Sequence, residues 1–411
     1  MVRMAGLIGV ALMAIAAAIA ICVDGNEFSN HREIKILRHL KRLNKPAVKS
    51  IKSEDGDVID CVPITNQPAF DNPLLKRHTI QMRPSFNPES DSTYTKKEAK
   101  AITQVWHKTG ECPNNTVPIR RTKKEDLLRP KFINSFGRKS HQSIPRTTTF
   151  DPTIGHQYAV MSARNAKFYG TEVAINLWKP YFSLAQTWVV SGNGSSLNTI
   201  EAGWQVYPEL YDDNNPRLFK HVNSTEKLNI IIIRRSRLQL MLLQAYNILC
   251  SGFVQTSNRY TVGGSFTTVS RYRGTQYDIS ILIWKDRKTG NWWLKINDKD
   301  VIGYWPGKLF TSLGDGATRV EWGGEIINSR TGGRHTTTDM GSGHFADEGF
   351  KKASYFRNLM IVDGTNTLRE PKSLYFFADK HNCYNVKTGN GGTSWGVHFF
   401  YGGPGRNVKC P

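Results

Sequence analysis

From residue 155 to residue 411, short runs of alternating polar and apolar residues follow one another, and this pattern constrains the fold more than any other feature. The runs are rich in aromatic and β-branched residues, which favour strands, and turns containing Gly or Asn separate them. Examples are HQYAVMSA, FSLAQTWVVSG, NTIEAGWQVYP, YDISILIWKD and NWWLKIND. Turn signals recur about every 8–12 residues, a spacing typical of an antiparallel sandwich or barrel. The sequence therefore predicts an all-β domain over residues 155–411.

The first residues have the composition of a secretory signal peptide. A short basic lead, Met1-Val2-Arg3, precedes an apolar run over 4–23 with small residues near its end. We expect removal of residues 1–24 and a secreted protein, extracellular, in the cell wall or on a vacuolar route. The alternative is an N-terminal anchor, because the run is nearly long enough to span a bilayer. No later apolar run approaches that length, so we expect no stable membrane insertion.

Cysteines and glycosylation sequons fit the same route. Three Asn-x-Ser/Thr sequons occur, at Asn114, Asn193 and Asn223. Outside the leader the cysteines are Cys61, Cys112, Cys250, Cys383 and Cys410. Their number is odd, so at least one is unpaired or pairs between chains.

The segment before the all-β domain reads as a small α+β module followed by a linker. Residues 29–43 carry apolar residues at helical spacing, and residues 48–84 contain four prolines and turn signals that forbid long regular elements. Residues 114–146 are basic, polar and poor in aromatics, which is typical of an exposed linker. The dibasic pairs in it are candidate processing sites.

The formal net charge of +21 is compatible with an acidic partner such as nucleic acid, anionic polysaccharide or a membrane surface. The basic residues are scattered, no nucleic-acid motif is evident, and the leader directs the chain to secretion. We therefore expect no nucleic-acid partner and interpret the charge as solubility in an acidic medium, or association with a wall.

Two carboxylates lie four residues apart in the stretch VEWGGEIINSRTGG. In a strand Glu321 and Glu325 face the same side, and glycine pairs lie before and after Glu325. Glycine within a strand often marks a close approach of another backbone. This arrangement suits a site for a peptide, and it also suits a plain surface strand that ends in a turn.

A third carboxylate lies in the run NTIEAGWQVYP. By alternation Glu201, Gly203 and Gln205 share one strand face, and Trp204 lies on the other. Two carboxylates from different strands, brought close together, do not ionise together easily, so one keeps its proton and the pair works in acid. Such a pair hydrolyses a peptide bond or a glycosidic bond, depending on its separation. An ordinary solvent-facing strand remains the alternative for Glu201.

Other catalytic designs are poorly supported. The chain has no HExxH or Cys-x-x-Cys motif. His335 and His344 lie in Gly-rich loops, where loop hydrogen bonds are the simpler interpretation. We therefore predict neither a metal nor a cofactor.

Nine motifs of the all-β region resemble the neprosin family, which are secreted plant glutamic peptidases. The motifs are IEAGWQVYPELY, CSGFVQ, YDISILIWKD, GNWWL, GYWP, VEWGGEI, HTTTDMGSGHFADEGF, ASYFRN and FFYGGPGRNVKCP. The stretch from residue 55 to 84 resembles the family's activation peptide. The resemblance implies an antiparallel β-sandwich of two facing sheets, with an inhibitory propeptide that is released in acid. It also implies cleavage after proline by two glutamates.

Carried onto this sequence, the resemblance gives residue roles. The catalytic glutamates are Glu201 and Glu325, with Glu321 as the fallback for the second. Trp204, Gln205, Tyr304 and Trp305 are the expected substrate-binding residues, with core packing as the alternative role of the aromatics. The implied disulfides are Cys61–Cys112 and Cys383–Cys410, which leaves Cys250 unpaired.

The resemblance also gives the domain organisation. We expect a signal peptide over 1–24, an activation peptide over 25–128, a linker with processing sites over 129–154 and a catalytic domain over 155–411. The expected partners are protein or peptide substrates and the chain's own propeptide, and the expected state is a monomer. The competing interpretations are an inactive sandwich that binds wall polysaccharide or protein, and a glycoside hydrolase.

The chain departs from the family pattern between residues 220 and 244. This segment lacks Gly, Pro, Asp, Cys and aromatic residues, unlike its surroundings, and the expected partner cysteine of Cys250 is missing. Our hypothesis is that this segment is a translated intron or comes from an altered splice form.

We predict that abundant transcripts differ from this sequence between codons 215 and 250. Sequencing of cDNA across that interval measures the difference. An uninterrupted match in abundant mRNA would contradict the hypothesis.

Overall fold

The computed structural model describes residues 33–34, 36–38, 40–90, 102–128, 155–224, 252–328, 333–389 and 395–411, and residues 243–246 by their backbone. The predicted signal peptide, the linker over 129–154, Cys250 and most of the atypical segment lie outside the described residues. No helix within the described ranges is long and apolar enough to cross a membrane.

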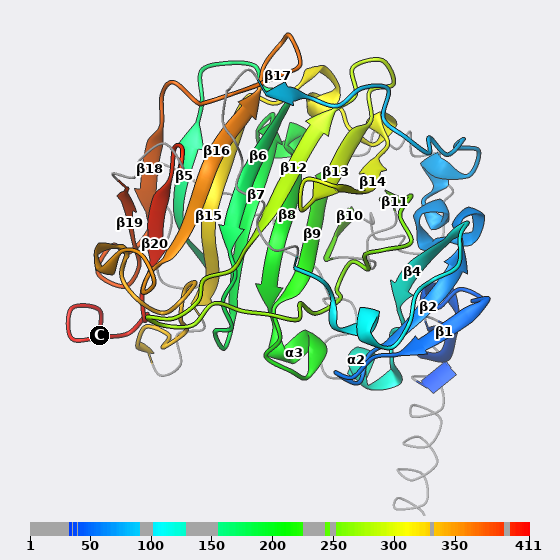
Figure 1. Cartoon of the computed structure of the whole chain (residues 1–411), viewed down its shortest axis with the longest axis horizontal. Coiled ribbons are helices and arrows are strands. Elements are labelled where there is room, and N and C mark those ends of the chain that lie inside the picture. Colours follow the sequence, from blue (N-terminus) through cyan, green and yellow to red (C-terminus); the bar gives the residue numbers. More distant parts are fainter. Residues whose placement is uncertain are drawn as a thin grey trace, which may run out of the picture.

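Two large sheets face each other and form a sandwich (Figure 1). The first sheet has seven strands, in the spatial order β10 (Leu243–Tyr246), β9 (Arg217–Ser224), β8 (Asn198–Val206), β7 (Ser183–Ser191), β15 (Arg319–Asn328), β5 (Gly155–Ala163) and β18 (Tyr375–Ala378). Its neighbouring strands are all antiparallel. The structure therefore confirms the predicted all-β sandwich of facing antiparallel sheets.

The second sheet has ten strands. Its main path is β11 (Val254–Gln255), β14 (Asp300–Trp305), β13 (Trp292–Ile296), β12 (Asp278–Lys285), β6 (Gly170–Asn176), β16 (Ser354–Val362), β17 (Thr367–Arg369) and β3 (Glu89–Ser90). The strands β19 (Asn385–Thr388) and β20 (Phe399–Gly402) join it through β16. The strand β3 comes from the segment before the sandwich and pairs parallel to β17.

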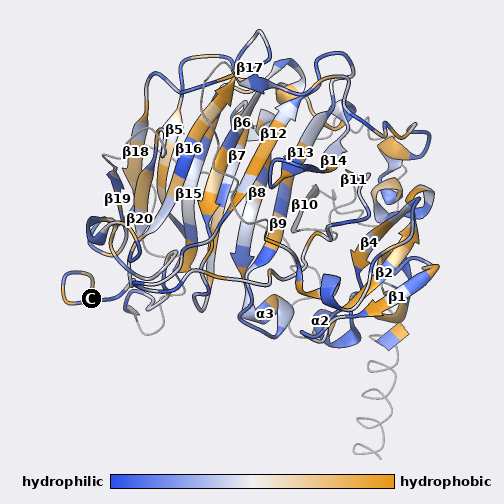
Figure 2. Cartoon of the chain, viewed as in Figure 1, coloured by the Kyte–Doolittle hydropathy of each residue, from blue (hydrophilic) through white to orange (hydrophobic). Residues whose placement is uncertain are grey.

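The core lies between the two sheets. Hydrophobic and hydrophilic residues alternate along many of the strands (Figure 2), as expected for strands with one face in the core. Trp204 of β8 and Trp322 of β15 are fully buried in it. Their indole N–H groups donate across the gap to β6, at 2.9 Å to Asn176 O and 2.9 Å to Thr171 Oγ1. Because residues alternate along a strand, Glu201 and Glu321 lie on the other face of the first sheet.

The N-terminal module is a three-stranded sheet with short helices. The strands are β1 (Lys49–Lys52), β2 (Val58–Pro63) and β4 (Thr116–Arg120), and the helix α2 (Lys124–Leu128) follows β4. The prediction of an exposed linker from residue 114 is therefore wrong for β4, which is buried and pairs with β2. The described residues between 33 and 43 are helical, within the helix predicted over 29–43. The disulfide Cys61–Cys112 lies in this module's own small core, and Cys383–Cys410 lies in the sandwich.

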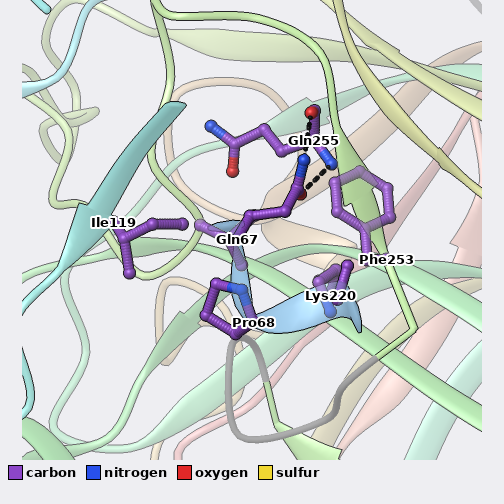
Figure 3. Close-up of a pocket in the computed structure, with 8 residues that line it drawn as sticks. Gln67, Pro68, Ile119, Lys220, Phe253 and Gln255 are labelled. Atoms are coloured by element: carbon purple, nitrogen blue, oxygen red, sulfur yellow. Dashed lines mark hydrogen bonds between the residues drawn. The ribbon is translucent and has the colours of Figure 1, made fainter. Parts of the chain in front are cut away.

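The module docks on the β11 end of the sandwich (Figure 1). The amide of Gln67 bonds the backbone of Gln255 twice, as a strand would, with Nε2 donating to O at 3.0 Å and N–H donating to Oε1 at 2.7 Å. A small pocket between module and sandwich adjoins this contact, and Phe253 is among the residues that line it (Figure 3).

Charges are also buried where the module meets the sandwich. Asp57 of the module accepts from Arg120 Nε of the module at 2.8 Å and from Arg217 Nη1 of β9 at 2.5 Å. Asp57 is 4 % exposed and Arg217 0 %. A buried ion pair that loses one member leaves the other charge uncompensated, which is strongly destabilising.

The ends of the atypical segment belong to the first sheet. Residues 220–224 complete β9 and pair in register with β8, and residues 243–246 form β10 beside β9. Residues 225–242 lie outside the described part of the chain, so the splicing hypothesis stays a prediction.

We predict that Asp57→Asn loosens the docked module. Asparagine keeps the size but leaves two arginines short of a negative charge, so unfolding of the full chain should become easier by about 3–5 kcal/mol. Denaturant unfolding of the full-length protein at neutral pH measures this.

Glu54→Gln is the matched control. The pair of Glu54 with Lys108 is about half exposed, with side-chain exposures of 53 % and 55 %, so its loss should change stability by less than about 1 kcal/mol. Equal effects of the two substitutions would contradict the role given to Asp57.

Candidate active site

Glu201 and Glu321 lie in one row across three neighbouring strands. Glu201 on β8 pairs with Trp188 on β7, and Trp188 pairs with Glu321 on β15. Paired residues of an antiparallel sheet point to the same face, so the indole stands between the two carboxylates. Neighbouring strands are about 4.8 Å apart, which places the backbones of the two glutamates roughly 10 Å apart. His221 on β9 continues the row beside Glu201.

The next row has glycine on both sides of a glutamine. Gln186 on β7 pairs with Gly203 on β8 and with Gly323 on β15. A Cβ on Gly203 would lie 2.0 Å from Ala185 O, and one on Gly323 2.3 Å from Ala159 O. The close approach of the strands therefore requires glycine there, as the sequence indicated, and leaves Gln186 without flanking side chains.

Glu325 lies one row further, beside Leu184 and Tyr158. Its carboxylate accepts from Gln186 Nε2 at 2.6 Å and from Tyr158 Oη at 3.4 Å, and Oε1 lies 2.5 Å from His156 Nδ1. As predicted, Glu325 points to the same face as Glu321. The two differ in surroundings, because Glu325 is held by several donors.

Glu321 is buried with little compensation. Neither of its carboxylate oxygens accepts a hydrogen bond from the residues that the structure describes, although Arg319 Nε lies 3.3 Å from Oε1 as an ion pair. Desolvation raises the pKa of Glu321 to about 7, with Glu201 adding to the rise and Arg319 and Arg164 opposing it. Below about pH 7 Glu321 is therefore mostly protonated.

Glu201 has donors instead. Its Oε1 accepts from Thr199 Oγ1 at 3.1 Å and lies 3.2 Å from His221 Nδ1. Hydrogen bonds to a carboxylate favour its ionised form. A buried carboxylate with a raised pKa, beside a carboxylate that accepts hydrogen bonds, can provide an acid and a base.

The predicted aromatic residues lie elsewhere. Trp204 is buried in the core on the opposite face of β8, and Trp305 packs on Phe253 in the second sheet. Tyr304 also belongs to the second sheet, and its hydroxyl accepts from the N–H of Gln81 in the N-terminal module at 2.9 Å. Of the predicted substrate-binding residues, Gln205 alone shares the face of the glutamates.

Sequence reasoning missed several residues of this face, namely Trp188, Gln186, His221, Tyr158 and His156. For Trp188 and Gln186 a signal was present, because FSLAQTWVVSG alternates and places both on one side of a strand. Alternation alone does not indicate that this strand, β7, lies between β8 and β15, which carry the glutamates.

The remaining predicted residues are also placed. Asn114 and Asn193 are exposed, whereas Asn223 is 8 % exposed within β9. His335 contacts Gln157 Oε1 at 2.8 Å and His344 contacts Glu348 at 2.8 Å. Cys383 and Cys410 lie near His335, but their sulfurs form a disulfide and so offer no thiolate to a metal.

Family comparison covers both parts of the chain. The neprosin family model matches residues 179–404, more than half of the chain, and the neprosin activation peptide model matches residues 50–162. The chain belongs to the neprosin family. Membership together with an activation peptide indicates a peptidase made as a zymogen. The second match runs into β5, a strand of the sandwich itself.

Solved structures give two remote likenesses. One is a scytalido-glutamic peptidase with a peptide-based transition state analog, with 9 % identity, a TM-score of 0.33, and coverage of 61 % of this chain and 98 % of that chain. The other is a beta-porphyranase from the human gut bacterium Bacteroides plebeius, with 8 % identity, a TM-score of 0.20, and coverage of 40 % and 53 %. Both are too loose to position individual residues.

We predict that Glu321 makes the stability of the full-length chain depend on pH. A pKa raised from 4.5 to about 7 means that the folded state holds a proton which the unfolded state releases. This contribution, on the order of 3 kcal/mol, is present below pH 4.5 and is lost as pH rises through 7.

Urea unfolding at pH 5 and pH 8 tests this prediction with Glu321→Gln, which should lose that part of the pH dependence. The exposed Glu111 provides the control, since Glu111→Gln should keep the wild-type dependence. An unchanged profile in Glu321→Gln would count against an uncharged Glu321.

Proposed function

We propose that the protein is a secreted glutamic endopeptidase, made as a zymogen, in which Glu201 and Glu321 activate water against a peptide bond. The observation that carries the proposal is the row Glu201–Trp188–Glu321, with donors on the first glutamate and none described on the second. One site thus holds a base and an acid.

The geometry supports a general acid–base mechanism. The Glu201 carboxylate takes a proton from a water molecule as its oxygen attacks the carbonyl carbon of the scissile bond. Protonated Glu321 donates a hydrogen bond to the carbonyl oxygen, where negative charge develops. When the tetrahedral intermediate collapses, the C–N bond breaks and the proton held by Glu201 passes to the leaving nitrogen. The products are a carboxylic acid and an amine, and both glutamates return to their starting state.

Glu321 takes precedence over the sequence-based choice of Glu325 in this proposal. Three groups surround the carboxylate of Glu325, and it lies two rows away from Glu201. Glu321 shares the row of Glu201 and carries the raised pKa. We assign Glu325 to positioning, through the amide of Gln186.

Acid pH and proline preference belong to the proposal. Glu321 acts as acid only while it is protonated, so the rate should fall as pH rises through its pKa. The indole of Trp188, between the glutamates, offers a flat apolar surface that suits a prolyl ring. The family resemblance supports cleavage after proline.

We expect the full-length chain to be inactive because the three glutamates are buried. Glu201, Glu321 and Glu325 are each 0 % exposed in the full-length chain, so a substrate cannot reach them. We infer that removal of the activation peptide opens the face. The cut belongs within 129–154, because the next strand, β5, pairs with β15 beside the site. Glycans are expected at Asn114 and Asn193, whose side chains are exposed.

We predict that the acid-processed protein cleaves proline-containing peptides and that Glu201→Gln or Glu321→Gln lowers kcat about 10²–10⁴-fold. Glu325→Gln should lower it about tenfold, because it misplaces a neighbour and removes no reacting group. Steady-state kinetics with a fluorogenic peptide at acid pH measures all three.

Three outcomes would contradict the proposal. A loss in Glu325→Gln as large as in Glu201→Gln would restore Glu325 as the second acid. Saturable glycan binding without cleavage would favour an inactive binding protein, and release of sugars would favour a glycoside hydrolase.

A further inference from the structure

Two glutamines on the glutamate face each leave one carbonyl oxygen unused. Gln186 donates through Nε2 to Glu325, and Gln205 donates through Nε2 to Tyr211 Oη at 3.0 Å. Their Oε1 atoms accept no hydrogen bond from any residue that the structure describes. Both side chains are 0 % exposed. Buried acceptors without a donor are rare in folded proteins and need an explanation.

The orientation of the Gln186 amide is fixed. Its Nε2 donates to Glu325 Oε2 at 2.6 Å, so the NH₂ group of the amide faces Glu325. The carbonyl must then point away from Glu325. His156 and Tyr158 hold that carboxylate from its other side.

The spacing of the two glutamines matches a peptide. Gln186 pairs with Gly203, and Gln205 follows two residues later on the same strand face, so the two are diagonal neighbours. Diagonal neighbours of a sheet lie about 7–8 Å apart. In an extended peptide the N–H groups of one edge recur every second residue, about 6.6–6.8 Å apart.

The surroundings of Gln186 on the glutamate face leave room for the main chain of a bound peptide. Gly203 and Gly323 flank Gln186, so no side chain on either neighbouring strand stands beside it in its row. The row of Glu201 and Glu321 is two residues away on each strand. A chain held at the two carbonyls therefore passes beside the proposed acid and base.

We propose that Gln186 and Gln205 are substrate-positioning residues whose side-chain carbonyls accept the main-chain N–H groups of residues i and i+2 of an extended peptide. This inference rests on the proposed peptidase function and adds how that site holds its substrate. Proline has no N–H, so proline at either of these two positions loses a hydrogen bond, whereas proline at the position between them does not. The pair thus limits the register in which a proline-containing chain binds.

A substrate-by-variant cycle tests the proposal. The protein, cut within residues 129–154, is titrated with a peptide whose scissile amide is replaced by a methylene-amine, and with versions N-methylated at one residue at a time. For wild type we expect N-methylation at two positions, two residues apart, to raise Kd about tenfold. In Gln186→Met one of these two losses should disappear, and in Gln205→Met the other.

Gln276→Met is the matched control. Gln276 also has an Oε1 without a described hydrogen bond, but it lies in a loop before β12, away from this face. This variant should keep both losses. Losses that persist unchanged in Gln186→Met and Gln205→Met would overturn the proposal.

Binding and catalysis are separable in this design. If the coupling is found but no cleavable peptide is hydrolysed, the inference stands and the proposed activity fails. If peptides are cleaved but N-methylation raises Kd as much in the glutamine variants as in wild type, the activity stands and the role of the glutamines is overturned. Absence of any peptide binding to the cut protein overturns both.

Discussion

The pairing register of β8, β7 and β15 is the constraint on which the site depends. It sets Glu201, Trp188 and Glu321 in one row, and Gly203, Gln186 and Gly323 in the next. A slip of one residue would send every side chain of a strand to the opposite face. Trp204 and Trp322 oppose such a slip, because each packs in the core and donates a hydrogen bond to β6 of the second sheet. The residues that hold the sheets together thus also keep the glutamates on the outer face.

The face that carries the glutamates also adjoins the N-terminal module. Arg217 of β9 pairs with Gln205 of β8, and through Gly263 and Asp57 it also contacts the loop before β12 and the N-terminal module. Asp57 of the activation module is therefore ion-paired with a residue of β9, the strand next to β8, which carries Glu201. Release of the module would remove one of the two negative partners of the fully buried Arg217, so we expect undocking to be coupled to rearrangement at this edge of the sheet. The other partner, Asp213, belongs to the sandwich and not to the module.

Much of this architecture could be predicted from residues alone, for local reasons. Period-two alternation and turn signals give the strands, and alternation also gives the shared face of Glu201, Gly203 and Gln205 and of Glu321 and Glu325. The order of strands in the sheet is a non-local property. Without knowing that β7 lies between β8 and β15, the sequence could not show that Trp188 and Gln186 share the face of the glutamates, nor that Glu201 is level with Glu321. For the same reason Trp204, Tyr304 and Trp305 looked like pocket residues, although the fold places them in its interior or under the activation module.

The choice between Glu321 and Glu325 shows what decides a role when two identical side chains share a strand face. Both are 0 % exposed and both lie on β15. Burial raises the free energy of a carboxylate unless hydrogen bonds compensate for the lost water. Gln186, Tyr158 and His156 provide that compensation to Glu325. Glu321 accepts no hydrogen bond from the described residues, and the charges of Arg319 and Arg164 offset its burial only in part. A compensated carboxylate orients its neighbours, and an uncompensated one retains a proton that a reaction can use. Glu321, whose carboxylate has the less favourable surroundings in the full-length chain, is therefore the better candidate for the acid.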